Sequence, residues 1–349
     1  MMADTKLTAT RNRIIDTAKG LGMILIVFAH ANYIEPGLSF LYSFHLPLFF
    51  ILSGLVFKPE RYDSFSVFFK KRLKSLILPY LIFAALSVGV QALLDIWEQG
   101  FSVRVLKNFL YNGGEIFIAR YSQTMRFNIP LWFVPCLFVL ECMYFWLAKI
   151  KNRALFGGAV LALVCFGWFA CSPYCFFDFS VLPWNFAAAC FSVGFFAVGH
   201  LCQGKLLEKI SGQPSLTKRL IMIASAALCF AGVLIVRHYN GHISIGSQAL
   251  NNGLLLYLSA IWGSMGVLLL AQLLSRSRIL NFFGRESFCI MATHHLFLNI
   301  ILAGYQQFRG GKIQDILLSW PKSLLVFVAI LLGSGLCTIV TMRIKKIRH

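Results

Sequence analysis

Charged residues are scarce in this sequence, and acidic ones are the scarcest. Only 13% of the 349 residues are charged, and 13 Asp and Glu stand against 32 Lys and Arg. A soluble domain carries about 25% charged residues, so the composition excludes an ordinary soluble protein. The ten cysteines include no CxxC pair. Buried free thiols are the expected state, although Cys171 and Cys175 flank a predicted external loop and could oxidise.

The sequence contains long apolar runs. Hydrophobic residues make up 58% of the chain, and apolar runs of about 20 residues recur along its whole length. The runs are continuous rather than alternating, which favours membrane helices over a barrel. We therefore predict an all-α, polytopic integral membrane protein with about ten transmembrane helices. We expect a single domain over 1–349, with no appended soluble domain. The predicted spans are 18–34, 40–57, 76–96, 130–148, 154–172, 183–202, 218–237, 254–274, 286–305 and 320–341.

The net charge of +19 follows the predicted topology. Basic residues concentrate in alternate connections, on the side that also holds both termini, whereas the opposite connections hold few. This is the positive-inside pattern, so both termini are expected in the cytoplasm. The excess charge therefore does not indicate nucleic-acid binding. The longest external connection is predicted over 97–129, and connections of that length are usually functional or disordered.

The first predicted helix carries a cation and an imidazole. Lys19 and His30 are eleven residues apart, which is about 16 Å along a helix axis. This spacing places Lys19 near one membrane face and His30 well inside the hydrocarbon. Ionisable groups at that depth are costly, and by default they are candidates for a functional site.

The second predicted span, 40–57, contains the stretch from Phe44 to Gly54, and His45 lies near its external end. Helices joined by a short connection must be neighbours, so His45 and His30 could share a cavity. Alternatively, His45 is an interfacial residue with a solvated ring. After this span comes a basic run from Lys70 to Lys74. Such a run could attract anionic lipid headgroups, or Lys71, Arg72 and Lys74 could bind the phosphates of a cytoplasmic cofactor; charge alone does not separate the two.

Several motifs occur in a distinctive order from about residue 13 to residue 305. They are Asp16…Lys19-Gly20…His30; Phe44-His45-x-Pro47-x-Phe49-Phe50-x-x-Ser53-Gly54; Arg72…Leu78-Pro79-Tyr80; Leu131-Trp132-Phe133-Val134-Pro135; and Asn281-Phe282-Phe283-Gly284-Arg285-Glu286-Ser287-Phe288-Cys289-Ile290, leading to His294. Together they resemble the acyltransferase 3 family, and the opening most resembles its fucose 4-O-acetylase-like branch. Lys19 stands where that family usually has arginine, which keeps the charge but loses the bidentate fork.

The resemblance implies a membrane O-acetyltransferase of the bacterial inner membrane. Such enzymes move acyl groups, mostly acetyl from acetyl-CoA, to hydroxyls of cell-envelope carbohydrates. The expected donor is therefore acetyl-CoA, and the expected acceptor is an envelope glycan or its lipid-linked precursor. Lys19, Lys71, Arg72 and Lys74 are expected to face the donor.

O-acylation needs a base that takes the proton of the acceptor hydroxyl, and neutral imidazole suits that role. His30 is the predicted base; the alternative is a histidine that merely forms a hydrogen bond between helices. Glu141 could orient an imidazole or pair with a basic residue. Adjacent His294 and His295 point about 100° apart, so one of them should face the cavity, and the resemblance favours His294 as a catalytic residue.

Two further residues are assigned to substrate binding. They are His45, at the external end, and Asp16, which could instead complement the helix dipole or hold Lys19. No metal is expected, because the histidines lack a close ligand spacing. Membrane lipids are the other expected partners. The alternative function is a transporter or exporter of a glycan or lipid-linked sugar, although the sequence contains no inverted repeat.

Overall fold

The computed structural model describes residues 2–31, 39–119, 127–171, 175, 182–203, 214–310 and 317–347. Within these ranges every regular element is a helix, and one isolated bridge joins Ser244 to Ala249. Nine helices in the described part are long and apolar enough to cross a membrane, and Phe40–Val56 is a shorter apolar stretch. The all-α, polytopic membrane fold predicted from the sequence is therefore confirmed.

The long helices overlap nine of the predicted spans. They are α1 (Met2–Ala31), the continuous helix formed by α3 (Phe65–Arg72), a π-helical turn η3 (Leu73–Ile77) and α4 (Leu78–Gln99), then α6 (Phe133–Leu147), α7 (Arg153–Ala170), α8 (Phe186–Leu201), α10 (Leu216–Asn240), α11 (Gly253–Leu273), α13 (Ser287–Arg309) and α15 (Trp320–Ile347). Of these, α1 and the helix of the third span begin well before the predicted starts.

The second predicted span, 40–57, is shorter in the structure than expected. A 3₁₀ turn, η1 (Ser39–Ser43), precedes the α-helix α2 (His45–Val56). The 12 residues of α2 rise about 18 Å, whereas a hydrocarbon core is roughly 30 Å thick. A helix of this length does not cross a bilayer by itself. It instead carries His45 on a short, mostly buried segment.

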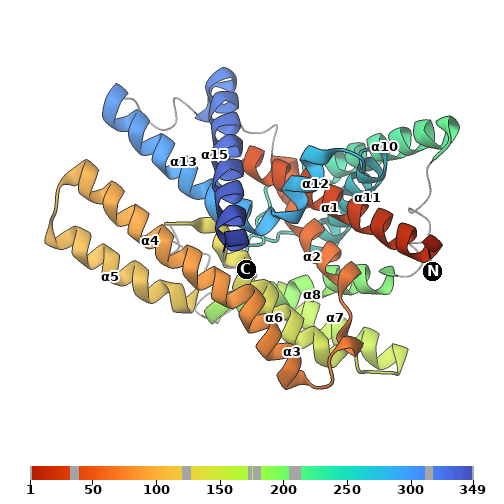
Figure 1. Cartoon of the computed structure of the whole chain (residues 1–349). Coiled ribbons are helices and arrows are strands. Elements are labelled where there is room, and N and C mark those ends of the chain that lie inside the picture. The colour runs from red at the N-terminus through yellow and green to blue at the C-terminus, as the bar shows by residue number, and fades with distance from the viewer. Residues whose placement is uncertain are drawn as a thin grey trace.

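The connection predicted as an external loop over 97–129 contains a helix of its own, α5 (Val103–Ile118). The Ser102 side chain caps it by accepting a hydrogen bond from the Val105 N–H. Figure 1 shows α5 running antiparallel to α4, on the opposite side of the molecule from the N-terminus. The Tyr80 hydroxyl donates to the Ile116 carbonyl at 2.6 Å, which joins the start of α4 to the end of α5.

Glycine permits the close crossing of α2 and α8. A Cβ at Gly54 would overlap the carbonyl oxygen of Phe196, and a Cβ at Gly199 would overlap the carbonyl oxygen of Ile51. The two helix backbones are therefore in direct contact, as small residues commonly allow in membrane proteins. This contact fixes the position of the helix that carries His45.

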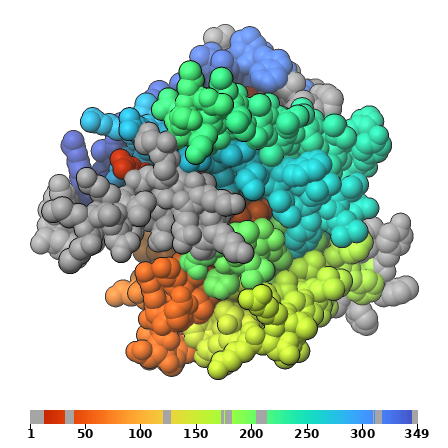
Figure 2. Space-filling view, turned by 90° about the vertical axis from the view of Figure 1, so that its right-hand side faces the viewer, coloured from red at the N-terminus to blue at the C-terminus, as the bar shows by residue number. Residues whose placement is uncertain are grey.

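The first helix occupies the centre of the fold. It contacts α2, α11, α13, α15 and the short helix α12 (Arg278–Arg285). The crossing with α12 also depends on glycine, since a Cβ at Gly284 would overlap the Asp16 carbonyl oxygen. Figure 2 shows α10 beside α11 on an outer face, with α7 below them. Lys19 and His30, both on the part of α1 from residue 14 onward, therefore lie inside a bundle of helices.

The cysteines, all of them within the described ranges, are free thiols. Cys171 lies just beyond the end of α7 and is buried. Burial raises the pKa of its thiol to about 12, so the thiol stays protonated at neutral pH. Cys171 and Cys175 are thus not joined in the structure.

Candidate active site

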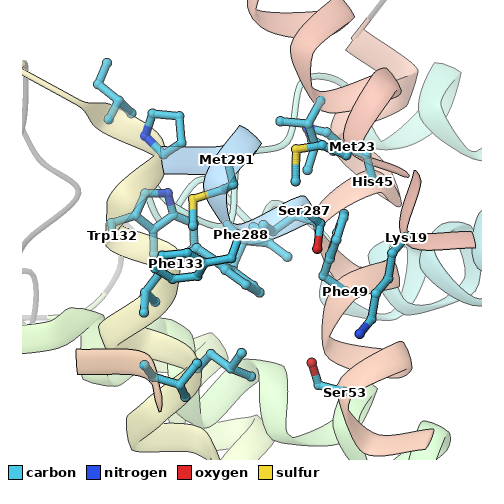
Figure 3. A pocket seen from close by; sticks show the side chains of 18 of the residues that line it. Lys19, Met23, His45, Phe49, Ser53, Trp132, Phe133, Ser287, Phe288 and Met291 are labelled. Atoms are coloured by element: carbon cyan, nitrogen blue, oxygen red, sulfur yellow. The ribbon is translucent and has the colours of Figure 1, made fainter. Parts of the chain in front are cut away.

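A cavity of about 290 Å³ opens among α1, α2, α6 and α13. Figure 3 shows Lys19 and Ser53 on one wall, Trp132 and Phe133 on the opposite wall, and Met291 of α13 between them. Five of the sequence-predicted site residues line this cavity, and they come from four separate stretches of the chain. These five are Lys19, His30, His45, Arg72 and Glu141.

One end of the cavity carries two cations. Arg72 reaches it from the end of α3, and its Nε lies 2.8 Å from Oε2 of Glu141 on α6. The Glu141 side chain is only 5% exposed, so the ion pair holds the guanidinium at the cavity wall. The sequence left two kinds of partner open for Glu141, an imidazole and a basic residue, and the structure shows the basic residue. Glu141 accordingly positions Arg72 in the described structure, and its predicted catalytic role has no contact with an imidazole to support it.

Lys19 is the second cation at this end, and its side chain is half-buried. It interacts electrostatically with Asp16, one turn earlier on α1. Asp16 also interacts with Arg285 of α12, and it does not line the cavity. The arrangement fits the sequence alternative in which Asp16 holds Lys19, rather than one in which Asp16 meets the substrate.

The remaining predicted donor-binding residues lie elsewhere. Lys71 and Lys74 are exposed and do not line the cavity. The Lys71 Nζ instead lies 5.3 Å from the centre of the Tyr62 ring. Successive residues on a helix point about 100° apart, so only one side chain of this basic run turns inward, and that one is Arg72. The other two fit the lipid-headgroup interpretation of the run.

The opposite end of the cavity is rich in imidazoles. The His30 ring centre lies 5.3 Å from that of His294 and 6.0 Å from that of His295. His30 is partly exposed to the cavity, whereas His294 is fully buried and His295 is 7% exposed. The sequence predicted that either His294 or His295 would face the cavity. In the structure neither lines it, and both lie behind His30.

His45 shares the cavity with His30, as one of the two sequence interpretations held. Its side chain is only 5% exposed, which does not fit an interfacial residue with a solvated ring. The Tyr42 ring centre lies 4.9 Å from that of His45, and the Tyr42 hydroxyl donates to the Ala29 carbonyl at 3.5 Å. The start of α2 is therefore held against the end of α1.

Sequence reasoning missed the connection between α10 and α11, which brings Ser244 and Ile245 to the cavity. Asparagines order this connection. Asn251 Nδ2 donates to the Asn240 carbonyl at 2.6 Å, and the Asn252 backbone N–H donates to Asn240 Oδ1 at 2.8 Å. The asparagine cluster around 240–252 was the available signal, because such side chains commonly bind nearby backbone groups in turns.

No group of three or more His, Cys, Asp or Glu residues is arranged to hold a metal ion in the described part of the chain. Cations at one end suit an anionic group, imidazoles at the other suit proton transfer, and the walls between them are largely apolar.

Comparison with known proteins identifies the family. The sequence model of the acyltransferase 3 family, an acyltransferase domain, matches residues 12–339. No significant match was found among curated proteins or among solved structures. The match covers all the residues that line the cavity, and the fucose 4-O-acetylase-like branch stays a prediction. The chain belongs to the acyltransferase 3 family and is a membrane acyltransferase.

Proposed function

We propose that this protein transfers an acetyl group from acetyl-CoA to a hydroxyl of a cell-envelope carbohydrate or its lipid-linked precursor. The observation that supports the proposal most is that one cavity joins the cations Lys19 and Arg72 to the imidazoles of His30 and His45. Lys19 and His30 are about 16 Å apart along α1. Anion binding and proton transfer therefore have separate places within one continuous space.

The cation end suits the phosphates of CoA. Guanidinium and ammonium groups form charge-assisted hydrogen bonds with phosphate, and the Glu141 carboxylate keeps Arg72 in place. A cavity of about 290 Å³ is small for a ligand pocket, so it would hold the acetyl-pantetheine arm, with the diphosphate of CoA at the two cations and the adenosine outside. The predicted topology places Lys19 nearer the cytoplasm, where acetyl-CoA is made available.

The imidazole end suits the reaction itself. His30 would take the proton of the acceptor hydroxyl as that oxygen attacks the thioester carbonyl carbon. The carbon–sulfur bond then breaks, the new ester keeps the acetyl group, and the proton on His30 passes to the departing thiolate to give free CoA. Tyr42, Trp132 and Ser244 line the same cavity, and such aromatic and hydroxyl side chains suit a sugar acceptor.

Release of free CoA thiol is the test of the proposed function. Purified protein in lipid nanodiscs would be given acetyl-CoA with and without envelope glycans or lipid-linked sugars. We expect thiol release that a suitable acceptor accelerates, with acetyl esters appearing on the acceptor. Absence of thiol release from folded protein with every acceptor would contradict the acetyl-CoA assignment, and release with another acyl-CoA alone would replace acetyl.

Removing the cavity arginine should weaken donor binding. The substitution Arg72→Ala is expected to raise the KM for acetyl-CoA about 10- to 100-fold, because a hydrogen bond to a charged group is worth about 1.5–3 kcal/mol. Steady-state thiol release over a range of acetyl-CoA concentrations measures it. Lys70→Ala is the matched control, since Lys70 is exposed on the same helix and does not line the cavity. Equal KM values for the two variants would place the donor elsewhere.

A further inference from the structure

The hydrogen bond of His294 determines which of its ring nitrogens carries the proton. Nδ1 lies 3.1 Å from the carbonyl oxygen of Ile290, one turn earlier on α13. A carbonyl oxygen can only accept, so Nδ1 must be the donor. In a neutral imidazole the other nitrogen is then an acceptor with a free lone pair. His294 is fully buried, and its Nε2 has no hydrogen-bond partner within the protein.

The free nitrogen of His294 points away from its own helix. Nδ1 bonds to the α13 backbone, and Nε2 lies across the ring from it. Ser287 and Met291 line the cavity, and His294 lies seven residues after Ser287 and three after Met291, so the three share one face of α13. Next to His294, this face of α13 meets the His30 ring of α1. The centres of the two rings lie 5.3 Å apart.

We propose that His294 is a positioning residue for His30. Its buried Nε2 accepts a hydrogen bond from one ring nitrogen of His30, directly or through one water, and so turns the other nitrogen toward the cavity. This inference rests on the proposed function, in which His30 is the base. The acceptor role usually belongs to a carboxylate. Among the described residues that line this cavity, the carboxylate is that of Glu141, and it is paired with Arg72 instead of an imidazole.

The assignment has a chemical consequence for the proton path. His30 keeps one N–H throughout, bound to His294, and uses its other nitrogen to take the hydroxyl proton and to return it to the thiolate. His294 keeps its own Nδ1 proton, which it donates in a hydrogen bond to the Ile290 carbonyl, and it exchanges no proton with His30. A fixed tautomer also spares His30 a ring flip between the two proton transfers.

Two substitutions at His294 separate positioning from a structural role. Asparagine places its amide near the position of Nδ1, so His294→Asn can keep the Ile290 hydrogen bond but offers no acceptor to His30. Glutamine reaches the position of Nε2, so His294→Gln keeps the acceptor and loses the Ile290 bond. We expect His294→Asn to lower kcat for CoA release about 10- to 100-fold, and His294→Gln to stay within about fivefold of the wild type.

The reverse order would overturn the proposal, because a purely structural histidine depends on the Ile290 bond and tolerates asparagine better. The same pair of substitutions at His295, whose ring also lies near His30, is the matched control. We expect no separation between His295→Asn and His295→Gln. If the Asn–Gln difference appears at His295 instead, the positioning role belongs to that residue and the assignment to His294 is wrong.

Nitrogen-15 NMR of histidine-labelled protein in lipid gives a readout that needs no activity. We expect His294 to carry its proton on Nδ1, and the His30 ring resonances to shift in His294→Asn but not in His294→Gln. A His294 proton on Nε2 would overturn the proposal. A wild type that releases no CoA but shows the expected tautomer and shifts would contradict the proposed function and leave the contact between the two histidines standing.

Discussion

Replacing His30 by alanine should lower the rate of CoA release by about 10²- to 10⁴-fold, the usual contribution of a general base. The physical reason is that His30 is the imidazole of the cluster that lines the cavity, whereas His294 and His295 lie behind it. Neither of these two imidazole rings lines the cavity. Thiol release by purified variants, measured at saturating acetyl-CoA, gives the change in kcat directly.

The control for this experiment is His238→Ala. His238 is exposed near the end of α10, does not line the cavity, and should keep its activity within about twofold. Both variants should elute as a single species and unfold at temperatures close to that of the wild type. Full activity in folded His30→Ala would remove His30 from the base role, and His45 would then be the imidazole of the cavity left to test.

Substituting Gly54 by alanine should destabilise the fold by about 3 kcal/mol or more. The new Cβ would overlap the backbone carbonyl of Phe196, and a backbone cannot move aside as a flexible side chain can. Helices α2 and α8 must therefore separate, which also displaces His45 and Ser53 from the cavity wall. We expect a lower unfolding temperature in detergent, together with a loss of CoA release.

Gly157→Ala is the matched control for Gly54→Ala. Gly157 lies within α7, and nothing surrounds the position that its Cβ would occupy within 4 Å. The change should leave stability equal or raise it by up to about 1 kcal/mol, because alanine favours a helix more than glycine does. If both variants unfold at the same temperature, the close crossing of α2 and α8 does not contribute to stability as the structure indicates.

Hydropathy predicted the long helices well because the bilayer leaves the chain little choice. An unpaired backbone group is costly in hydrocarbon, so a run of about 20 apolar residues becomes a helix whatever its neighbours are. The two departures have local causes. A 3₁₀ turn shortens α2 at its start, and α5 mixes Arg104 and Lys107 with its apolar residues, which conceals it from a search for apolar runs.

The candidate site was predictable as a set of residues but not as an arrangement. The sequence indicated Lys19, His30, His45, Arg72 and Glu141, and all five line one cavity. It gave no means of choosing among the basic residues from Lys70 to Lys74, since they share charge and differ only in the direction each takes from the helix. The asparagines around 240–252 indicated an ordered connection, but not that this connection brings Ser244 to the same cavity.

By itself the sequence determined the membrane-embedded helical fold, the family, and the spacing of Lys19 and His30 along one helix. These depend on composition, on order along the chain and on the fixed rise of a helix. The tertiary structure alone decided that Glu141 pairs with Arg72 and that His294 lies behind His30. Such pairings depend on how each helix is rotated and where helices cross, and here contacts such as that of Gly54 with Phe196 set the crossings, which hydropathy along the chain does not encode.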